Sequence, residues 1–155
     1  MNSPDIHLIF LAVMGGLFST LLMTFVELPS WKRWGLHGVF EWHENQIISL
    51  KVFKPSSKKN QFVGIFVFHF LNGIMGGIGF LLVLWFFPTS VSHILLSSIT
   101  YGVFLWGVTL IPLHKTITGI SPWSHPLGHL PALTSLAGHV VYGAALGYFF
   151  MNTPF

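Results

Sequence analysis

The sequence predicts an all-α integral membrane protein with four transmembrane helices, and composition gives the first reason. The chain has 155 residues, of which 52% are hydrophobic and only 7% are charged. A soluble domain carries about 25% charged residues, so this chain has too few charges to cover a water-facing surface. Four apolar stretches, about 8–28, 62–87, 91–112 and 130–151, also have the length of roughly 20 residues that a membrane-spanning helix needs. We therefore treat residues 1–155 as a single integral membrane domain.

The first apolar stretch, "LIFLAVMGGLFSTLLMTFVEL" (8–28), is too long for the core of a signal peptide. No basic residue precedes it and no small-x-small cleavage site follows it. We expect it to be a retained transmembrane helix.

The connections between the four stretches predict the orientation of the chain in the membrane. Only "PTSV" (88–91) separates the second and third stretches, which therefore form a tight helical hairpin, whereas the other connections, 29–61 and 113–129, are longer. All seven basic residues lie in these two longer connections: Lys32, Arg33, Lys51, Lys54, Lys58, Lys59 and Lys115. Because short cytoplasmic loops carry the excess of Lys and Arg, we expect both long loops to be cytoplasmic and both termini to lie outside.

The first long loop has the pattern of an interfacial amphipathic helix that follows the first span. Six of its residues recur at helical spacing: Val39, Phe40, His43, Ile47, Leu50 and Lys51. Trp31, Trp34 and Trp42 are typical anchors at the level of the lipid headgroups. The second loop, "LHKTITGISPWSHPLGHLP" (113–131), is rich in proline and glycine, so we expect an irregular segment held at the membrane by Trp123.

A nine-residue pattern in the second span returns in the fourth span. "HFLNGIMGG" (69–77) and "HVVYGAALG" (139–147) share one histidine and two glycines, which lie four residues apart on one helix face. The matched positions are His69 and His139, Gly73 and Gly143, and Gly77 and Gly147, with Asn72 and Tyr142 in a shared polar position. We infer a two-helix unit that is present twice. Because small residues let membrane helices approach closely, we expect spans two and four to pack through these glycines, against each other.

The polar residues of the spans gather in their cytoplasmic half, as an intramembrane cluster of Glu27, His69, Asn72, His139 and Tyr142. Such residues usually face the interior of a bundle. The two histidines would serve either as ligands of a metal or haem or as neutral rings that hydrogen-bond across the helix interface. The second reading is the simpler one, since one histidine per helix is a weak metal signal. We read Glu27 as an interfacial cap or as an ion-pair partner of Lys32 or Arg33.

Nine histidines are present, and those of the two long loops are candidates for a surface metal site together with Glu41 or Glu44. The candidate ligands are His37, His43, His125 and His129. The absence of cysteine excludes disulfides, thiolate metal sites and thiol nucleophiles. No phosphate-binding glycine loop and no nucleophile elbow occur, so the sequence argues against an enzyme that acts alone. The seven basic residues are better explained by membrane topology than by nucleic-acid binding.

Four strings of the sequence, "MTFVELPSWKRWGL", "EWHENQ", "SPWSHPLGHLPAL" and "GHVVYGAALGYFF", resemble a poorly characterised family of small four-helix membrane proteins of archaea and some bacteria. The resemblance covers most of the chain and brings no activity with it. Some small proteins of this kind are accessory subunits of membrane oxidases, including archaeal complexes of the ammonia monooxygenase type. By analogy, the resemblance implies a place in such a complex.

Three functions therefore follow as expectations. The first is a non-catalytic accessory or scaffold subunit of a larger membrane complex, without a cofactor, whose partners are the lipid bilayer and other membrane subunits or further copies of the chain. The second is a small transporter or channel that acts as an oligomer, since repeat interfaces often hold substrate sites. The third is a membrane protein that ligates a metal or haem through histidine.

Overall fold

A computed structural model describes residues 6–54 and 57–152, and these residues fold into helices joined by short connections. The α-helices are α1 (Ile6–Trp34), α2 (Phe40–Phe53), α3 (Lys58–Phe86), α4 (Val91–Val108), α5 (His114–Thr118) and α6 (Leu130–Met151). Two 3-10 turns, η1 (Gly35–Gly38) and η3 (Pro122–Ser124), and one π-helical turn, η2 (Thr109–Leu113), complete the elements. No strand occurs in the described part of the chain, so the all-α prediction is confirmed.

Four helical segments of the described chain are long and apolar enough to cross a membrane, which confirms a bundle of transmembrane helices. They are Ile6–Gly38, Asn60–Phe86, Val91–Thr118 and Leu130–Met151. Two of them run further than the apolar stretches predicted. α1 continues through Pro29, and α4 continues through η2, which contains Pro112, into α5. Packing against neighbouring helices and local π-helical geometry let a membrane helix tolerate proline.

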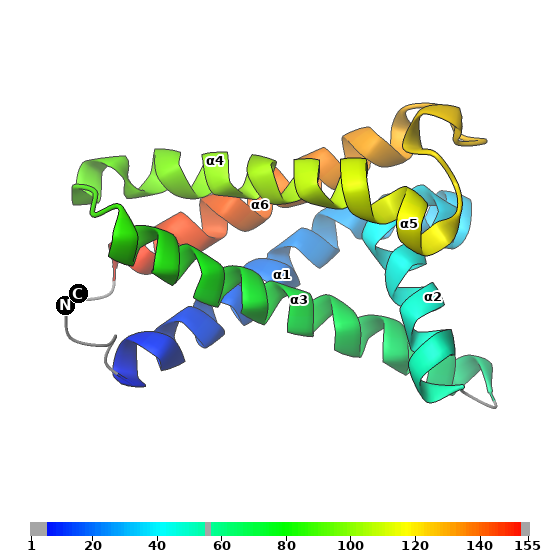
Figure 1. Ribbon diagram of the computed structural model, residues 1–155, viewed down its shortest axis with the longest axis horizontal. Coiled ribbons are helices and arrows are strands. Elements are labelled where there is room, and N and C mark those ends of the chain that lie inside the picture. Colours follow the sequence, from blue (N-terminus) through cyan, green and yellow to red (C-terminus); the bar gives the residue numbers. More distant parts are fainter. Residues whose placement is uncertain (1–5, 55–56, 153–155) are drawn as a thin grey trace.

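The four long helices, α1, α3, α4 and α6, form two closely packed pairs that are joined at the centre (Figure 1). α1 packs along α3, α4 packs along α6, and α1 also packs along α6. α3 and α4 meet near the turn that joins them and then diverge, as Figure 1 shows. At the divergent end α2 packs on α3, α5 and α6. α3 and α4 are therefore in contact near their turn, and their backbones lie apart at the other end.

Glycines allow the helices of the two close pairs, α1 with α3 and α4 with α6, to approach each other. A Cβ atom added to Gly77 would lie 3.0 Å from the Cα of Gly16 in α1, and one added to Gly143 would lie 2.9 Å from the Cα of Ile99 in α4. Gly73 likewise faces α1 and Gly147 faces α4. The expectation that spans two and four meet through these glycines is therefore wrong about the partner, because the glycines of α3 face α1 and those of α6 face α4.

Trp42 is buried and is not the headgroup anchor that the sequence predicts. Its side chain is 0% exposed and packs in a core cluster with Val39 and Ile65. A buried indole needs an acceptor for its N–H group, and Glu27 in α1 supplies one. Trp123, in contrast, is exposed.

The helix predicted in the first loop is present as α2, but the side chains that it buries are largely polar. Glu41, Glu44, Asn45 and Ser49 are buried, whereas Leu50 is exposed. The hydrophobic pattern did not indicate this face, because the groups that pair with these side chains come from other helices.

A polar cavity as the candidate functional site

A cavity of about 390 Å³ lies where α3 and α4 diverge. α2, α3 and α6 supply most of its polar wall, with Glu41, Glu44, Asn45, His69, Asn72, His139 and Tyr142. Apolar side chains from α3, α4, η2 and α5 form much of the rest: Met75, Leu105, Val108, Leu113 and Ile117. The cavity therefore combines a polar interior with an apolar border.

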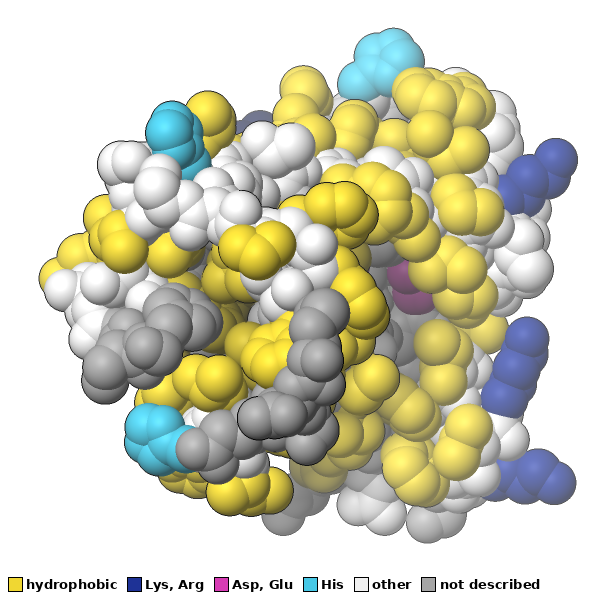
Figure 2. Space-filling view, turned by 60° about the vertical axis from the view of Figure 1, so that its left-hand side comes forward, with side chains coloured by type: hydrophobic (Ala, Val, Ile, Leu, Met, Phe, Trp, Pro, Cys, Tyr) yellow, Lys and Arg dark blue, Asp and Glu magenta, His cyan; other side chains and the backbone are white. Residues whose placement is uncertain are grey.

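The mouth of the cavity lies between two membrane-length helices. At the border Met75 is 66% exposed, and Leu113 on the opposite side is also exposed. Figure 2 shows acidic side-chain atoms at the bottom of a hollow that hydrophobic side chains surround. Both border residues belong to helical segments that are long and apolar enough to cross a membrane.

Three glutamates in and beside the cavity each lie near a histidine of another helix. The Oε1 atom of Glu44 lies 2.9 Å from Nδ1 of His114 in α5. Oε1 of Glu41 lies 3.5 Å from Nδ1 of His139 in α6, and Oε2 of Glu27 lies 3.8 Å from Nε2 of His69 in α3. These pairs explain why α2 packs with its polar face inward, since buried acidic groups need partners.

Two polar atoms of the wall are buried and have no hydrogen-bond partner in the described protein. The Ser135 hydroxyl donates to Oε1 of Glu41, but Oε2 of Glu41 has no partner. The Asn72 amide donates to Oδ1 of Asn45 at 3.2 Å, but Nδ2 of Asn45 has no partner. Buried polar atoms of this kind call for an explanation, such as a bound water, ion or ligand.

Neighbouring groups fix which ring nitrogen of the two cavity histidines carries hydrogen when the rings are neutral. Nδ1 of His139 lies 2.9 Å from the backbone carbonyl of Ser135, which only accepts, so Nε2 keeps its lone pair. The Thr24 hydroxyl donates to the carbonyl of Thr20 at 2.7 Å, so its oxygen accepts from Nε2 of His69 at 3.1 Å. The lone pair of His69 is therefore on Nδ1. Both rings offer one acceptor beyond these contacts.

Burial changes the acidity of the groups that lie outside the spans. It raises the pKa of Glu44 to about 9, with a smaller contribution from the charge of Glu41. Burial lowers the pKa of His43 and of His125, and the nearby His37 lowers both further. At neutral pH, Glu44 is therefore a neutral carboxylic acid.

The raised pKa of Glu44 predicts that the bundle loses stability as pH rises from about 4.5 to about 9. In this window the unfolded chain releases the proton, whereas the folded protein retains it, so raising pH favours unfolding. Glu44→Gln keeps a hydrogen-bonding side chain but cannot titrate, and it should flatten this dependence. Thermal unfolding in detergent at pH 5, 7 and 9 compares the two proteins, and equal slopes would contradict the assignment.

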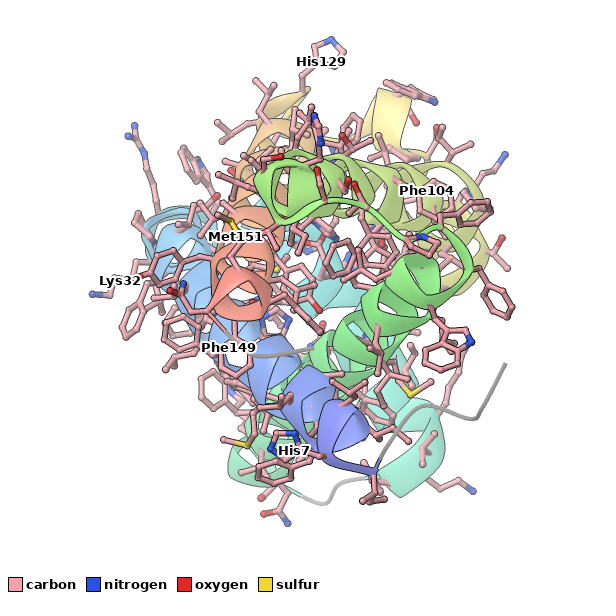
Figure 3. The ribbon with its side chains drawn as sticks, turned by 90° about the vertical axis from the view of Figure 1, so that its left-hand side faces the viewer. His7, Lys32, Phe104, His129, Phe149 and Met151 are labelled. Carbon is pink, nitrogen blue, oxygen red and sulfur yellow. The ribbon has the colours of Figure 1, made fainter. Side chains whose placement is uncertain are left out.

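The predicted surface metal ligands are only partly brought together. The ring centroid of His37 lies 4.9 Å from that of His43 and 6.1 Å from that of His125. The ring centroid of His114, another histidine of the second loop, lies 6.1 Å from that of His43, whereas His129 points away from the bundle in Figure 3. Within the described residues, no group of three or more acidic or histidine side chains is arranged to hold a metal ion.

Glu27 differs from its predicted role. It is 0% exposed, it accepts a hydrogen bond of 2.8 Å from Nε1 of Trp42, and its other oxygen has no partner. Lys32 and Arg33, its expected ion-pair partners, are exposed. Glu27 therefore belongs to the buried polar network and is no interfacial cap.

The other four residues of the predicted intramembrane cluster, His69, Asn72, His139 and Tyr142, all line the cavity. Tyr142 donates to the backbone carbonyl of Gly73 at 2.7 Å and so ties α6 to α3. Sequence reasoning missed the contribution of α2 to the cavity. The spacing of Glu41, Glu44 and Asn45 is a signal that could have found it, because residues three and four apart share one helix face.

The chain matches one protein family. The family described as "Family of unknown function (DUF6789)" matches residues 6–154. No curated protein and no solved structure matches the chain. The function must therefore be inferred from the cavity.

Proposed function

From the premise that the chain belongs to the DUF6789 family of unknown function, we propose that it is a membrane-embedded binding protein for a small amphiphilic molecule. The polar head of this molecule lies in the cavity, and its apolar tail leaves between α3 and α4. The molecule enters from the lipid.

The observation that carries this proposal is a polar cavity with an apolar mouth between two helical segments that are long and apolar enough to cross a membrane. Its volume of about 390 Å³ falls within the range of small-molecule sites. Unpaired polar groups at this depth are costly, because lipid provides no hydrogen bonds. A bound head group would pair with Oε2 of Glu41 and Nδ2 of Asn45, which lack partners in the described protein.

Asn72 gives a second reason to expect an occupant at the mouth. It lies near the middle of the span Asn60–Phe86 and is exposed, although one of its amide hydrogens reaches Asn45. Polar residues inside membrane helices usually face the bundle and mark substrate paths. An amphiphile in the mouth would cover this amide.

Blocking the mouth should reduce the amount of bound molecule. In Val108→Trp an indole replaces a small side chain on the cavity wall, whereas Leu96→Trp makes a matched change on the same helix at a position that is 65% exposed. Native mass spectrometry of protein released from lipid nanodiscs should show one small-molecule adduct on the wild type and on Leu96→Trp. We expect at least fivefold less adduct on Val108→Trp. An adduct of equal abundance on all three proteins, or no adduct on the wild type, would contradict the proposal.

A role as an accessory subunit is the second candidate, and the same mouth favours it. A transmembrane helix of another subunit, laid between α3 and α4, would cover Asn72 and Met75. Purification in mild detergent would then recover a stoichiometric partner protein. Transport has less support in this conformation, because Phe80, Leu146 and Phe150 form an apolar core on the side toward the chain ends.

We also propose that the two halves of the bundle are an internal repeat. In the first half Gly73 and Gly77 of α3 pack on α1, and in the second half Gly143 and Gly147 of α6 pack on α4. Both halves carry their extra elements, α2 or α5, between the paired helices. The cavity would then lie between the repeats, a common place for sites in membrane proteins. Superposition of the two pairs in an experimental structure tests this.

The orientation of the chain in the membrane is a further proposal, with both long loops cytoplasmic and both termini outside. Figure 2 shows basic side chains gathered on one side of the molecule. The chain has no cysteine, so single cysteines can report the sides. In intact cells a membrane-impermeant maleimide should label Ser92→Cys, in the exposed α3–α4 turn region, and should label Lys115→Cys only after lysis. The reverse pattern would overturn the orientation.

A further inference from the structure

Resting on the proposed binding role, we propose that the head group held in the cavity is a protonated primary amine. The cavity wall leaves mainly hydrogen-bond acceptors free, and its charged side chains are acidic.

The free atoms of the wall are mainly acceptors. They include Nδ1 of His69 and Nε2 of His139, whose lone pairs are set by the hydrogen bonds of the other ring nitrogens. Oε2 of Glu41 is a third acceptor, buried and without a partner in the described protein. Nδ2 of Asn45 is the one such donor on the wall. A ligand that matches this wall must chiefly donate hydrogen bonds.

The charge of the wall favours a cationic donor. Glu41 lines the cavity, and among the residues that line it there is no Lys or Arg. Lys32, Arg33, Lys51, Lys54, Lys58 and Lys115 are all exposed. Buried charges are normally paired, so a cation beside Glu41 compensates its carboxylate in a way that a hydroxyl does not.

The arrangement of the acceptors fits three N–H donors better than a quaternary ammonium. Glu41, His69 and His139 come from α2, α3 and α6, so the three acceptors surround the polar end of the cavity. A primary ammonium has three N–H donors, as the lysine side chain does. A quaternary ammonium has none and needs the faces of several aromatic rings. The aromatic side chains of this wall are Tyr101 and Tyr142, whose hydroxyls donate to the backbone of α3.

The test compares three probes with the same ten-carbon tail on the wild-type protein in phosphatidylcholine nanodiscs. Decylammonium has charge and three donors, decyltrimethylammonium has charge alone, and 1-decanol has one donor and no charge. Native mass spectrometry should show one decylammonium per protein and at least tenfold lower retention of the other two probes. Equal retention of decanol or decyltrimethylammonium would overturn the amine assignment, and it would leave the binding proposal standing.

Variants locate the site. Glu41→Gln and His139→Ala should each lower decylammonium retention at least tenfold, whereas His129→Ala, at an exposed histidine, should leave it unchanged. Unaltered retention in both cavity variants would also overturn the assignment. Retention of no probe, together with an intact native adduct on the wild type, refutes the amine class alone. Loss of both the probes and the native adduct refutes the proposed function as well.

Discussion

Replacing Gly143 with leucine is expected to destabilise the bundle more than any other single glycine substitution in α6. A Cβ atom at this position would meet the backbone of Ser98 and would lie 2.9 Å from the Cα of Ile99. A side chain could relieve this contact by changing its rotamer, but backbone atoms cannot. α4 and α6 would therefore have to move apart. Overpacking typically costs about 1–3 kcal/mol, and the longer leucine side chain places this change at the upper end. Thermal unfolding of the protein in detergent measures the loss.

Ala137 is the matched control, because it lies on the same helix and is exposed. Ala137→Leu should leave the unfolding temperature nearly unchanged. Ala145, two residues from Gly143, is a poor control because it is only 8% exposed. Equal tolerance of leucine at Gly143 and Ala137 would show that α4 and α6 do not meet through this glycine.

Replacing Glu27 with alanine is expected to have the second large effect. The change leaves the indole N–H of Trp42 buried without an acceptor and removes the carboxyl group beside His69. Leaving a buried donor unpaired costs on the order of 1–3 kcal/mol, and the space left by the side chain adds to this. Thermal unfolding of the protein in detergent measures the loss.

Glu27→Gln distinguishes the contribution of the hydrogen bond to Trp42 from the contribution of the ionisable carboxyl group. Glutamine has nearly the same shape and keeps a carbonyl oxygen that accepts from Trp42, so it should recover most of the stability that alanine loses. Trp42→Phe combined with Glu27→Ala should cost less than the sum of the two single changes, since both remove the same bond. Additive losses would mean that this hydrogen bond contributes little to the fold.

The sequence predicts the cavity residues that lie in the spans, but it does not predict those that lie in α2. His69, Asn72, His139 and Tyr142 were recognised because a polar side chain inside an apolar stretch is conspicuous and nearly always faces protein. Glu41, Glu44 and Asn45 lie in a segment that is polar as a whole. There the same residue types are typical of a solvated surface, and nothing local distinguishes a buried face from an exposed one. The same ambiguity led to the wrong environment for Trp42.

The packing of the glycines was also only partly predictable from the sequence. Their spacing indicates that a helix face is smooth, which is a local property of the chain. The spacing does not indicate which helix lies against that face, because every span of this chain carries small residues. The choice of α1 for α3, and of α4 for α6, depends on the arrangement of all the helices together.

The sequence by itself determined the helical class, the membrane as solvent and the four spans, because a chain with 7% charged residues cannot dissolve its surface in water. It also determined the polar positions within those spans. Only the tertiary structure decided that α3 and α4 diverge, that α2 packs on the bundle with its carboxyl groups inward, and that a cavity results. The physical reason is that burying an acidic side chain is favourable only when partners from distant parts of the chain, here His114 and His139, are brought beside it.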